Sequence, residues 1–280
     1  MMAGQHTELC LSLSERPGST GAFVQNALAA RFGLDRVYLP RQVKRGNLSA
    51  AVTGIRALNI SGFAVSSPFK EEVIMHLDHV TMHAAKIRSV NTVVNDAGML
   101  IGHSTDGDGF KQAYGKMLED ARVSAAVVLG AGPAARAVTQ ALNEMGIIVH
   151  VCARRSRNYE LAASMFCSSG SVIDIDALPC RSSAATTSVP TVIINATSER
   201  DDVLHGCITP AFLSEYVALI DINVGDTAMI RAARGHTGFV DGLRMAVAQS
   251  LLQFELWTGV MLGDHAQELE NMVELLQKVQ

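Results

Sequence analysis

Short apolar runs alternate with segments of helical periodicity along the chain. In the middle, the run Val127–Leu129 predicts a buried strand, and apolar residues at helical spacing between Ala134 and Met145 predict a helix. Gly146 ends this helical pattern, and the apolar run Ile147–Val151 predicts a second strand. The pattern is typical of a β-α-β unit with parallel strands.

The turn between the first strand and the helix is rich in glycine. It reads Gly130-Ala131-Gly132-Pro133-Ala134 and, with the alanine that follows, has the form G-x-G-x-x-A. Glycines allow a tight bend and a close backbone approach, the free N–H groups that begin a helix face an anion, and proline suits the first helical position. A simple strand-to-helix connection can look the same, but the two flanking strands favour a nucleotide-phosphate site.

The segments on either side of this unit predict further α/β structure. A hairpin expected around Asp96-Ala97-Gly98 makes the sheet before the unit mixed. Before the unit we expect strands at Leu9–Leu13, Val37–Leu39, Gly62–Val65, Thr92–Asn95 and Leu100–Ser104, and helices at Val24–Phe32, Leu48–Leu58 and Gly107–Leu118. After it we expect strands at Val192–Asn195 and Val217–Ile222, a surface loop at Arg181–Ser188, and helices at Leu243–Leu256 and Ala266–Val279. Because single cores tend to divide near a length of 280 residues, two α/β domains are expected.

Composition and charge exclude several classes of protein. The net charge is −4 with no basic stripe, so nucleic-acid binding has little support. No apolar stretch approaches the ~20 residues of a membrane span, and residues 1–8 lack a charged and then apolar leader, so we expect a cytoplasmic protein. The five cysteines are scattered without a C-x-x-C pair, which argues against a disulfide framework and a zinc site. His76, His79 and His83 have the spacing of one helical face, but on a peripheral helix we expect no metal there.

Polar side chains follow three of the expected strands. Lys70 comes soon after the strand that ends at Val65, while Asn91 and Asp106 lie at two further strand ends. Because ligands bind at the carboxyl ends of strands in open α/β sheets, these three side chains are candidates to hold a polyhydroxylated substrate and to move its proton. For Lys70 alone, a solvated residue at the start of a helix is an equally good interpretation.

Six ordered motifs carry a resemblance to a known family: Ser66-x-Pro68-Phe69-Lys70, Val90-Asn91-Thr92, Thr105-Asp106-Gly107, Gly130-Ala131-Gly132, Asn195-Ala196-Thr197-Ser198, and Asp241-Gly242-Leu243 with Gln249 and Glu255-Leu256-Trp257. Over nearly the whole chain the sequence resembles the shikimate dehydrogenase family. The resemblance implies a mixed-sheet α/β substrate domain, residues 1–106 and 241–280, to which the C-terminal helices return, and a Rossmann-type NADP-binding domain, residues 107–240. It also implies reversible hydride transfer between NADP(H) and shikimate or its 3-dehydro ketone.

Carried over to matching positions, the resemblance makes Lys70 and Asp106 the catalytic pair. It makes Asn91, Gln249 and Ser66 ligands of the substrate, with Ser66 in place of the family's threonine. The glycine turn, from Gly130 to Ala134, together with Thr197 and Gly242, would bind the cofactor.

The choice of cofactor can be argued from the residues themselves. The second strand of the β-α-β unit is followed by Arg154, Arg155 and Arg157, and an acidic residue is absent there. A carboxylate at this point would bind the ribose of NAD, whereas arginines fit the 2′-phosphate of NADP. A solvated basic turn is the alternative, and we predict NADP.

Departures from the family pattern affect the substrate. The usual Ser-x-Ser pair near the N-terminus, which binds the substrate carboxylate, is matched by Ser19 and Gly21, while Ser12 and Ser14 lie out of register. Val224 replaces a tyrosine. These changes resemble the divergent shikimate dehydrogenase-like branch. Quinate or aminoshikimate dehydrogenases, a non-catalytic sensor of NADP or a metabolite, and assembly as a homodimer stay open.

Overall fold

The computed structural model describes residues 4–154, 160, 171–174, 189–197, 214–225, 227–233 and 238–279. It forms two compact units, Met1–Gly109 with Ala246–Gln280, and Phe110–Met245. Each unit has its own six-stranded sheet. The loop expected at 181–188 lies outside the described residues, and the assignment of one unit to a substrate and of the other to a dinucleotide stays a prediction.

The sheet of the first unit is mixed, in the order β2-β1-β3-β5-β6-β4. Strands β1 and β2 and strands β1 and β3 are parallel, whereas β5 is antiparallel to β3 and to β6. The turn of the β5–β6 hairpin places Ala97 and Gly98 at positive φ, which confirms the expected hairpin. The strands are β1 (Glu8–Ser14), β2 (Arg36–Gln42), β3 (Gly62–Val65), β4 (His79–Val80), β5 (Thr92–Asp96) and β6 (Met99–His103).

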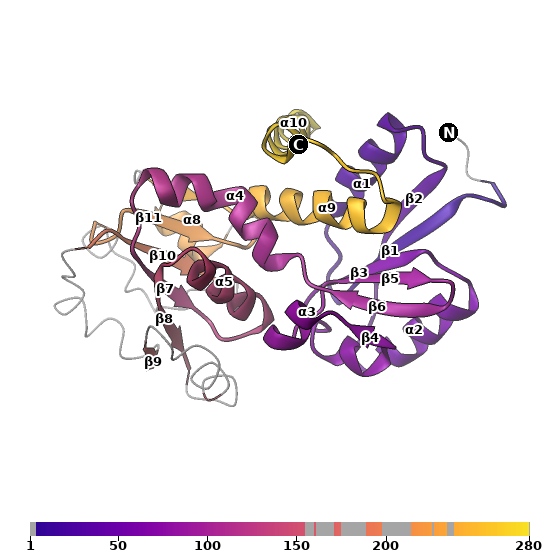
Figure 1. The fold of residues 1–280 in the computed structure, drawn as a ribbon, viewed down its shortest axis with the longest axis horizontal. Coiled ribbons are helices and arrows are strands. Elements are labelled where there is room, and N and C mark those ends of the chain that lie inside the picture. The colour runs from indigo at the N-terminus through magenta and orange to yellow at the C-terminus, as the bar shows by residue number, and fades with distance from the viewer. Residues whose placement is uncertain are drawn as a thin grey trace. The chain divides into compact units, whose positions relative to one another are not determined.

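Helices cover both faces of this sheet (Figure 1). Along β1, alternate residues enter different cores: Leu13 packs in the core shared with α2 and η1, whereas Cys10 packs with Tyr38 and Trp257 on the face of α1 and α9. The helical elements of this unit are α1 (Thr20–Arg31), α2 (Leu48–Ala57), η1 (Glu72–His76), α3 (Met82–Ile87), residues 246–258 of α9 (Leu243–Thr258) and α10 (His265–Val279).

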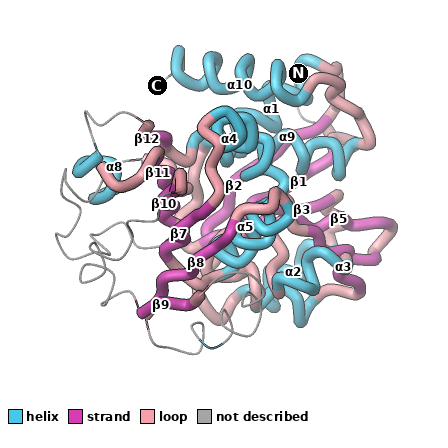
Figure 2. Tube along the Cα trace, turned by 60° about the vertical axis from the view of Figure 1, so that its left-hand side comes forward, coloured by secondary structure: helices cyan, strands magenta, loops and turns pink. Residues whose placement is uncertain are grey.

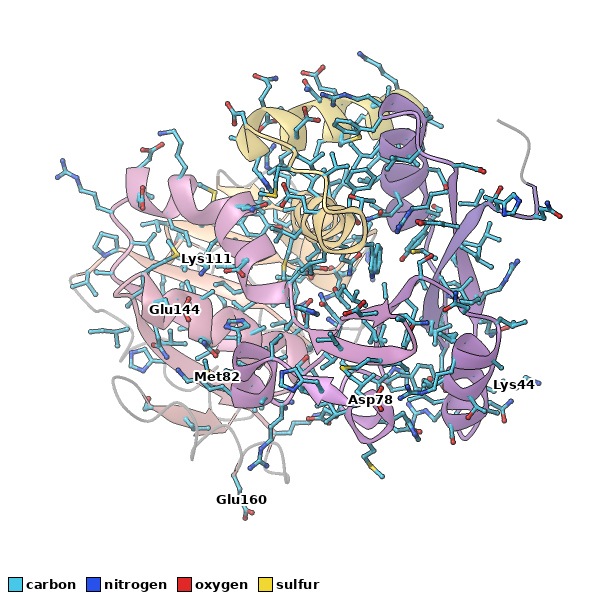
Figure 3. The ribbon with its side chains drawn as sticks, turned by 45° about the vertical axis from the view of Figure 1, so that its right-hand side comes forward. Lys44, Asp78, Met82, Lys111, Glu144 and Glu160 are labelled. Carbon is cyan, nitrogen blue, oxygen red and sulfur yellow. The ribbon has the colours of Figure 1, made fainter. Side chains whose placement is uncertain are left out.

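The second unit has a parallel sheet in the order β12-β11-β10-β7-β8-β9, seen as neighbouring strands in Figure 2. This is the strand order of a Rossmann-type domain. All five residues of β7 are buried, as in strands covered on both faces. The elements are α4 (Asp106–Asp120, from residue 110), β7 (Ala125–Leu129), α5 (Pro133–Glu144), β8 (Ile148–Ala153), β9 (Val172–Asp174), β10 (Thr191–Asn195), β11 (Ala218–Asp221), α8 (Ala228–Ala233) and β12 (Phe239–Val240). Lys111 of α4 and Glu144 of α5 form an ion pair of 2.9 Å (Figure 3).

The expectation that three histidines share one helical face is wrong. His76 ends a short 3₁₀ helix, His79 lies in β4 and His83 lies in α3. The helix stops because Leu77 adopts an extended conformation, with φ −99° and ψ 152°. Within the described ranges, no group of three His, Cys, Asp or Glu side chains is placed to hold a metal. In the same ranges, none of the helices combines the length and apolar character that crossing a membrane requires.

We predict that Gly62→Ala lowers the free energy of unfolding by about 1–3 kcal/mol. A Cβ atom on Gly62 would lie 2.5 Å from the indole nitrogen of Trp257, which donates a hydrogen bond of 2.9 Å to the Val93 carbonyl. Urea unfolding followed by the fluorescence of the single tryptophan measures the effect. Gly54→Ala is the control, because a Cβ on Gly54 meets nothing within 4 Å, and an equal loss in both variants would contradict the packing argument.

Candidate active site

An ion pair between Lys70 and Asp106 forms the centre of the site. The Lys70 ammonium lies 2.8 Å from both carboxylate oxygens of Asp106. The Lys70 side chain is 11% exposed and that of Asp106 is fully buried. An ammonium carries three hydrogens, and two of them bond the Asp106 oxygens. With respect to the described residues, the third hydrogen remains for another acceptor, such as a hydroxyl or carbonyl oxygen of a ligand.

Backbone hydrogen bonds bring the three strand ends together. Lys70 lies in the turn after β3, and the buried Phe69 packs this turn against the core. The Lys70 carbonyl accepts a hydrogen bond from the N–H of Val90 at 2.9 Å. Asn91 donates its backbone N–H to the carbonyl of His103, at the end of β6. Asp106 is the first residue of α4, three positions further along the chain. The juxtaposition of Lys70, Asn91 and Asp106 is therefore built into the pairing of β3, β5 and β6.

Asn91 uses its whole side chain within this network. Its amide nitrogen donates to Asp106 Oδ1 at 3.1 Å and to Thr105 Oγ1 at 2.9 Å. Its oxygen accepts the backbone N–H of Thr105 at 2.9 Å and the hydroxyl of Thr92 at 2.7 Å. The structure thus places Asn91 against the catalytic candidate Asp106, while its role as a ligand of the substrate stays a prediction.

Helix α9 brings two glutamines to the first unit's site. Gln249 is half-buried, and its side chain and backbone lie so close to Gly109 that a Cβ there would come within 2.7 Å of Gln249 Cγ. Sequence reasoning missed Gln253, one turn later, which donates to Thr92 Oγ1 at 3.0 Å. The spacing of four residues from Gln249 placed Gln253 on the same helix face and was the signal available.

The candidate serines lie in different surroundings. Ser12 hydrogen-bonds Tyr38, whose pKa is raised by burial, so this phenol stays neutral. The Ser14 hydroxyl is buried, and within the described part of the chain it has no hydrogen-bond partner. Ser19 is exposed at the start of α1 and Ser66 is exposed after β3. Which of these side chains binds a substrate stays a prediction.

The glycine turn of the second unit has the geometry of an anion site. Gly130 has φ +110°, and a Cβ on it would lie 3.0 Å from the carbonyl oxygen of Ala196. Gly132 precedes α5, and Pro133 is the first residue of this helix. Because neither glycine carries a side chain, a ligand can approach the first N–H groups of α5. This geometry fits a dinucleotide phosphate.

A buried carboxylate organises the loops beside this turn. Asp221, at the end of β11, accepts hydrogen bonds from Asn195 at 3.0 Å, from Thr227 at 2.6 Å, and from the backbone and side chain of Asn223 at 3.0 and 2.8 Å. Asn195 in turn accepts the N–H and hydroxyl of Thr197. These contacts fix Thr197, a candidate cofactor ligand, next to the glycine turn.

The other cofactor candidates are placed in part. Gly242 is buried, and a Cβ there would lie 2.2 Å from the carbonyl oxygen of Ile222, so backbone packing already requires a glycine. Arg154 is exposed directly after β8. Arg155 and Arg157 lie outside the described residues.

Comparison with known proteins decides the family. A family model described as the shikimate dehydrogenase substrate binding domain matches residues 18–93. Over 270 residues the chain is 33% identical to a shikimate dehydrogenase (NADP(+)) of Pyrococcus furiosus. The alignment covers 93% of this chain and 90% of that protein. The chain belongs to the shikimate dehydrogenase family.

Solved structures of the shikimate dehydrogenase family share the fold. A shikimate dehydrogenase from Aquifex aeolicus is similar with a TM-score of 0.81 at 28% identity, over 97% of this chain and 99% of the other. A shikimate 5-dehydrogenase-like protein has a TM-score of 0.74 at 26% identity, over 99% and 100% of the two chains. The predicted α/β fold, with a mixed sheet and a Rossmann-type sheet, is confirmed. Membership of the divergent branch stays a prediction.

We predict that Asp221→Asn lowers the free energy of unfolding by about 1–3 kcal/mol, because an amide group would face hydrogen-bond donors in a buried position. Urea denaturation followed by circular dichroism measures the loss. Asp120→Asn is the matched control, since the Asp120 carboxylate forms an exposed ion pair with Lys116, which contributes little to stability. Equal stability of Asp221→Asn and wild type would show that the network does not hold these loops.

Proposed function

We propose that this protein is an NADP-dependent oxidoreductase that interconverts shikimate, or a related cyclic hydroxy acid, and the 3-dehydro ketone by hydride transfer. The observation that carries the proposal is the buried Lys70–Asp106 pair, hydrogen-bonded to Asn91. The relative from Pyrococcus furiosus, a shikimate dehydrogenase (NADP(+)), supports the same assignment. The finer proposals are that it acts in the cytoplasm and that Lys70, Asp106, Asn91 and Gln249 contact the substrate.

The ion pair can move the proton that accompanies hydride transfer. In the direction of reduction, the Lys70 ammonium donates a proton to the ketone oxygen as that oxygen gains negative charge. In the direction of oxidation, the neutral Lys70 amine that is left after this donation, still hydrogen-bonded to Asp106, accepts the proton of the ring hydroxyl. Asp106 holds the Lys70 nitrogen through both carboxylate oxygens, which orients its remaining hydrogen toward the substrate. Bound nicotinamide supplies the hydride chemistry itself.

The second unit fits the proposed cofactor. Gly130 and Gly132 leave the start of α5 open to a pyrophosphate, and Arg154 stands after β8, where it would meet the phosphate on the adenosine ribose.

We expect removal of either member of the pair to lower kcat/KM for shikimate by at least about 10²-fold, because general acid–base catalysis contributes on that scale. Lys70→Ala and Asp106→Asn test this with NADP⁺ in a spectrophotometric assay. The control is Lys111→Ala, which breaks a lysine–carboxylate pair on the helices of the second unit and should keep the wild-type rate. Unchanged rates in the Lys70 and Asp106 variants would remove the mechanism.

For the cofactor, we expect Arg154→Ala to raise KM for NADP⁺ about tenfold or more and to leave KM for NAD⁺ unchanged, since a guanidinium binds the 2′-phosphate through charged hydrogen bonds. Steady-state kinetics with both nucleotides measures the difference. A wild-type KM for NAD⁺ equal to or below that for NADP⁺ would overturn the proposed preference.

Two alternatives are separated by a substrate panel. Shikimate, quinate and an aminoshikimate compared side by side with NADP⁺ identify the preferred acid. Tight binding of NADPH in a calorimeter, together with failure to turn over every acid of the panel, would support a sensor instead. Light scattering of the purified protein distinguishes a monomer from the homodimer that we leave open.

A further inference from the structure

A chain of hydrogen bonds runs from helix α9 to the carboxylate of the ion pair. Gln253 Nε2 donates to Thr92 Oγ1 at 3.0 Å, and the Thr92 hydroxyl donates to Asn91 Oδ1 at 2.7 Å. Asn91 Nδ2 donates to Asp106 Oδ1 at 3.1 Å, and Lys70 bridges both oxygens of Asp106. Gln253 is 6% exposed, and Thr92 and Asp106 are fully buried.

The direction of this chain is fixed by groups that can act in only one way. The backbone N–H of Thr105 can only donate, so the Asn91 oxygen must face it and the Asn91 nitrogen must face Asp106. The Thr92 hydroxyl has one hydrogen, which Asn91 accepts, so Gln253 must be the donor to Thr92. Each bond therefore orients the next.

Helix α9 is held on strand β5 next to this chain. Trp257, one helical turn after Gln253, donates to the carbonyl of Val93 at 2.9 Å, adjacent to Thr92. The side chain of Gln253 consequently reaches Thr92 from a helix that is fixed in position on the sheet. Because a buried amide requires a partner, the hydrogen bond to Thr92 satisfies the buried amide nitrogen of Gln253.

From this geometry we propose that Gln253 is a positioning residue for the reaction: through Thr92 it holds the Asn91 amide against Asp106 and so sets the position of Lys70. This inference rests on the proposed function for its kinetic readout. Gln253 itself need not touch the substrate.

The kinetic test is a double-mutant cycle on Gln253 and Thr92. We expect Gln253→Met and Thr92→Val each to lower kcat for shikimate oxidation by about three- to tenfold, as loss of one neutral hydrogen bond would. The double variant should be no slower than the worse single variant, because both changes break one chain. Thr92→Ser, which keeps the hydroxyl, should restore most of the rate. KM for NADP⁺ should stay constant in all four variants.

A matched control separates positioning from stability. Gln25 is also buried and donates to a carbonyl of α9, that of Ser250, at 2.6 Å, but it takes no part in the chain. Gln25→Met should therefore lower the midpoint of thermal unfolding as Gln253→Met does, with kcat unchanged. Equal losses of kcat in these two variants, or strictly additive losses at positions 92 and 253, would overturn the proposal.

A readout without turnover keeps the inference distinct from the proposed function. In ¹⁵N-labelled protein, the side-chain amide resonances of Asn91 should shift in Gln253→Met and in Thr92→Val but not in Gln25→Met. If the wild-type protein turns over no cyclic acid while the Asn91 resonances shift in the variants, the proposed activity is contradicted and the hydrogen-bond chain is supported. If the Asn91 resonances do not shift in Gln253→Met, the proposed hydrogen-bond chain is refuted, whether or not the protein is active.

Discussion

The burial of one ion pair governs the architecture of the first unit's site. Removing a charged lysine or aspartate from water costs free energy. Only close contact between the two charges, with hydrogen bonds to the remaining lone pairs, offsets this desolvation cost. Asp106 meets the requirement with two bonds from Lys70 and one from Asn91. Loss of any member would leave a buried charge or amide unmatched, so the surrounding residues are constrained together.

The sheet of the first unit satisfies this constraint through its strand order. Strands β3, β5 and β6 are neighbours, and the residues at their ends are tied by main-chain hydrogen bonds from Val90 to Lys70 and from Asn91 to His103. Lys70 and Asp106, far apart along the chain, are consequently positioned by backbone geometry. Side-chain contacts then need only orient groups that already lie close to one another.

Much of this arrangement could be predicted from local pattern. Apolar alternation and turn residues predicted β1, the β5–β6 hairpin and the β7-α5-β8 unit, because each depends on residues close in sequence. The break at Leu77 separates His76 from His79, and the next residue, Asp78, donates its N–H to the Leu100 carbonyl of β6; periodicity cannot show such a long-range contact. Gln253 was missed because its role depends on Thr92, a residue far away in sequence, and the helical pattern of α9 does not reveal that partner.

The Asn91 amide is saturated before any ligand arrives, since all of its hydrogens and its oxygen are bound within the protein. A ring hydroxyl that hydrogen-bonds the Asn91 amide must displace a partner such as Thr105. One hydrogen bond then replaces another, so the net gain in binding free energy is small. Under the proposed mechanism, binding of the resting ligand therefore gains little at this amide, and the stronger interaction forms when negative charge builds on the oxygen that receives the Lys70 proton. Under the same proposal, discrimination between similar cyclic acids depends on how each acid presents its carbon–oxygen bond to Lys70.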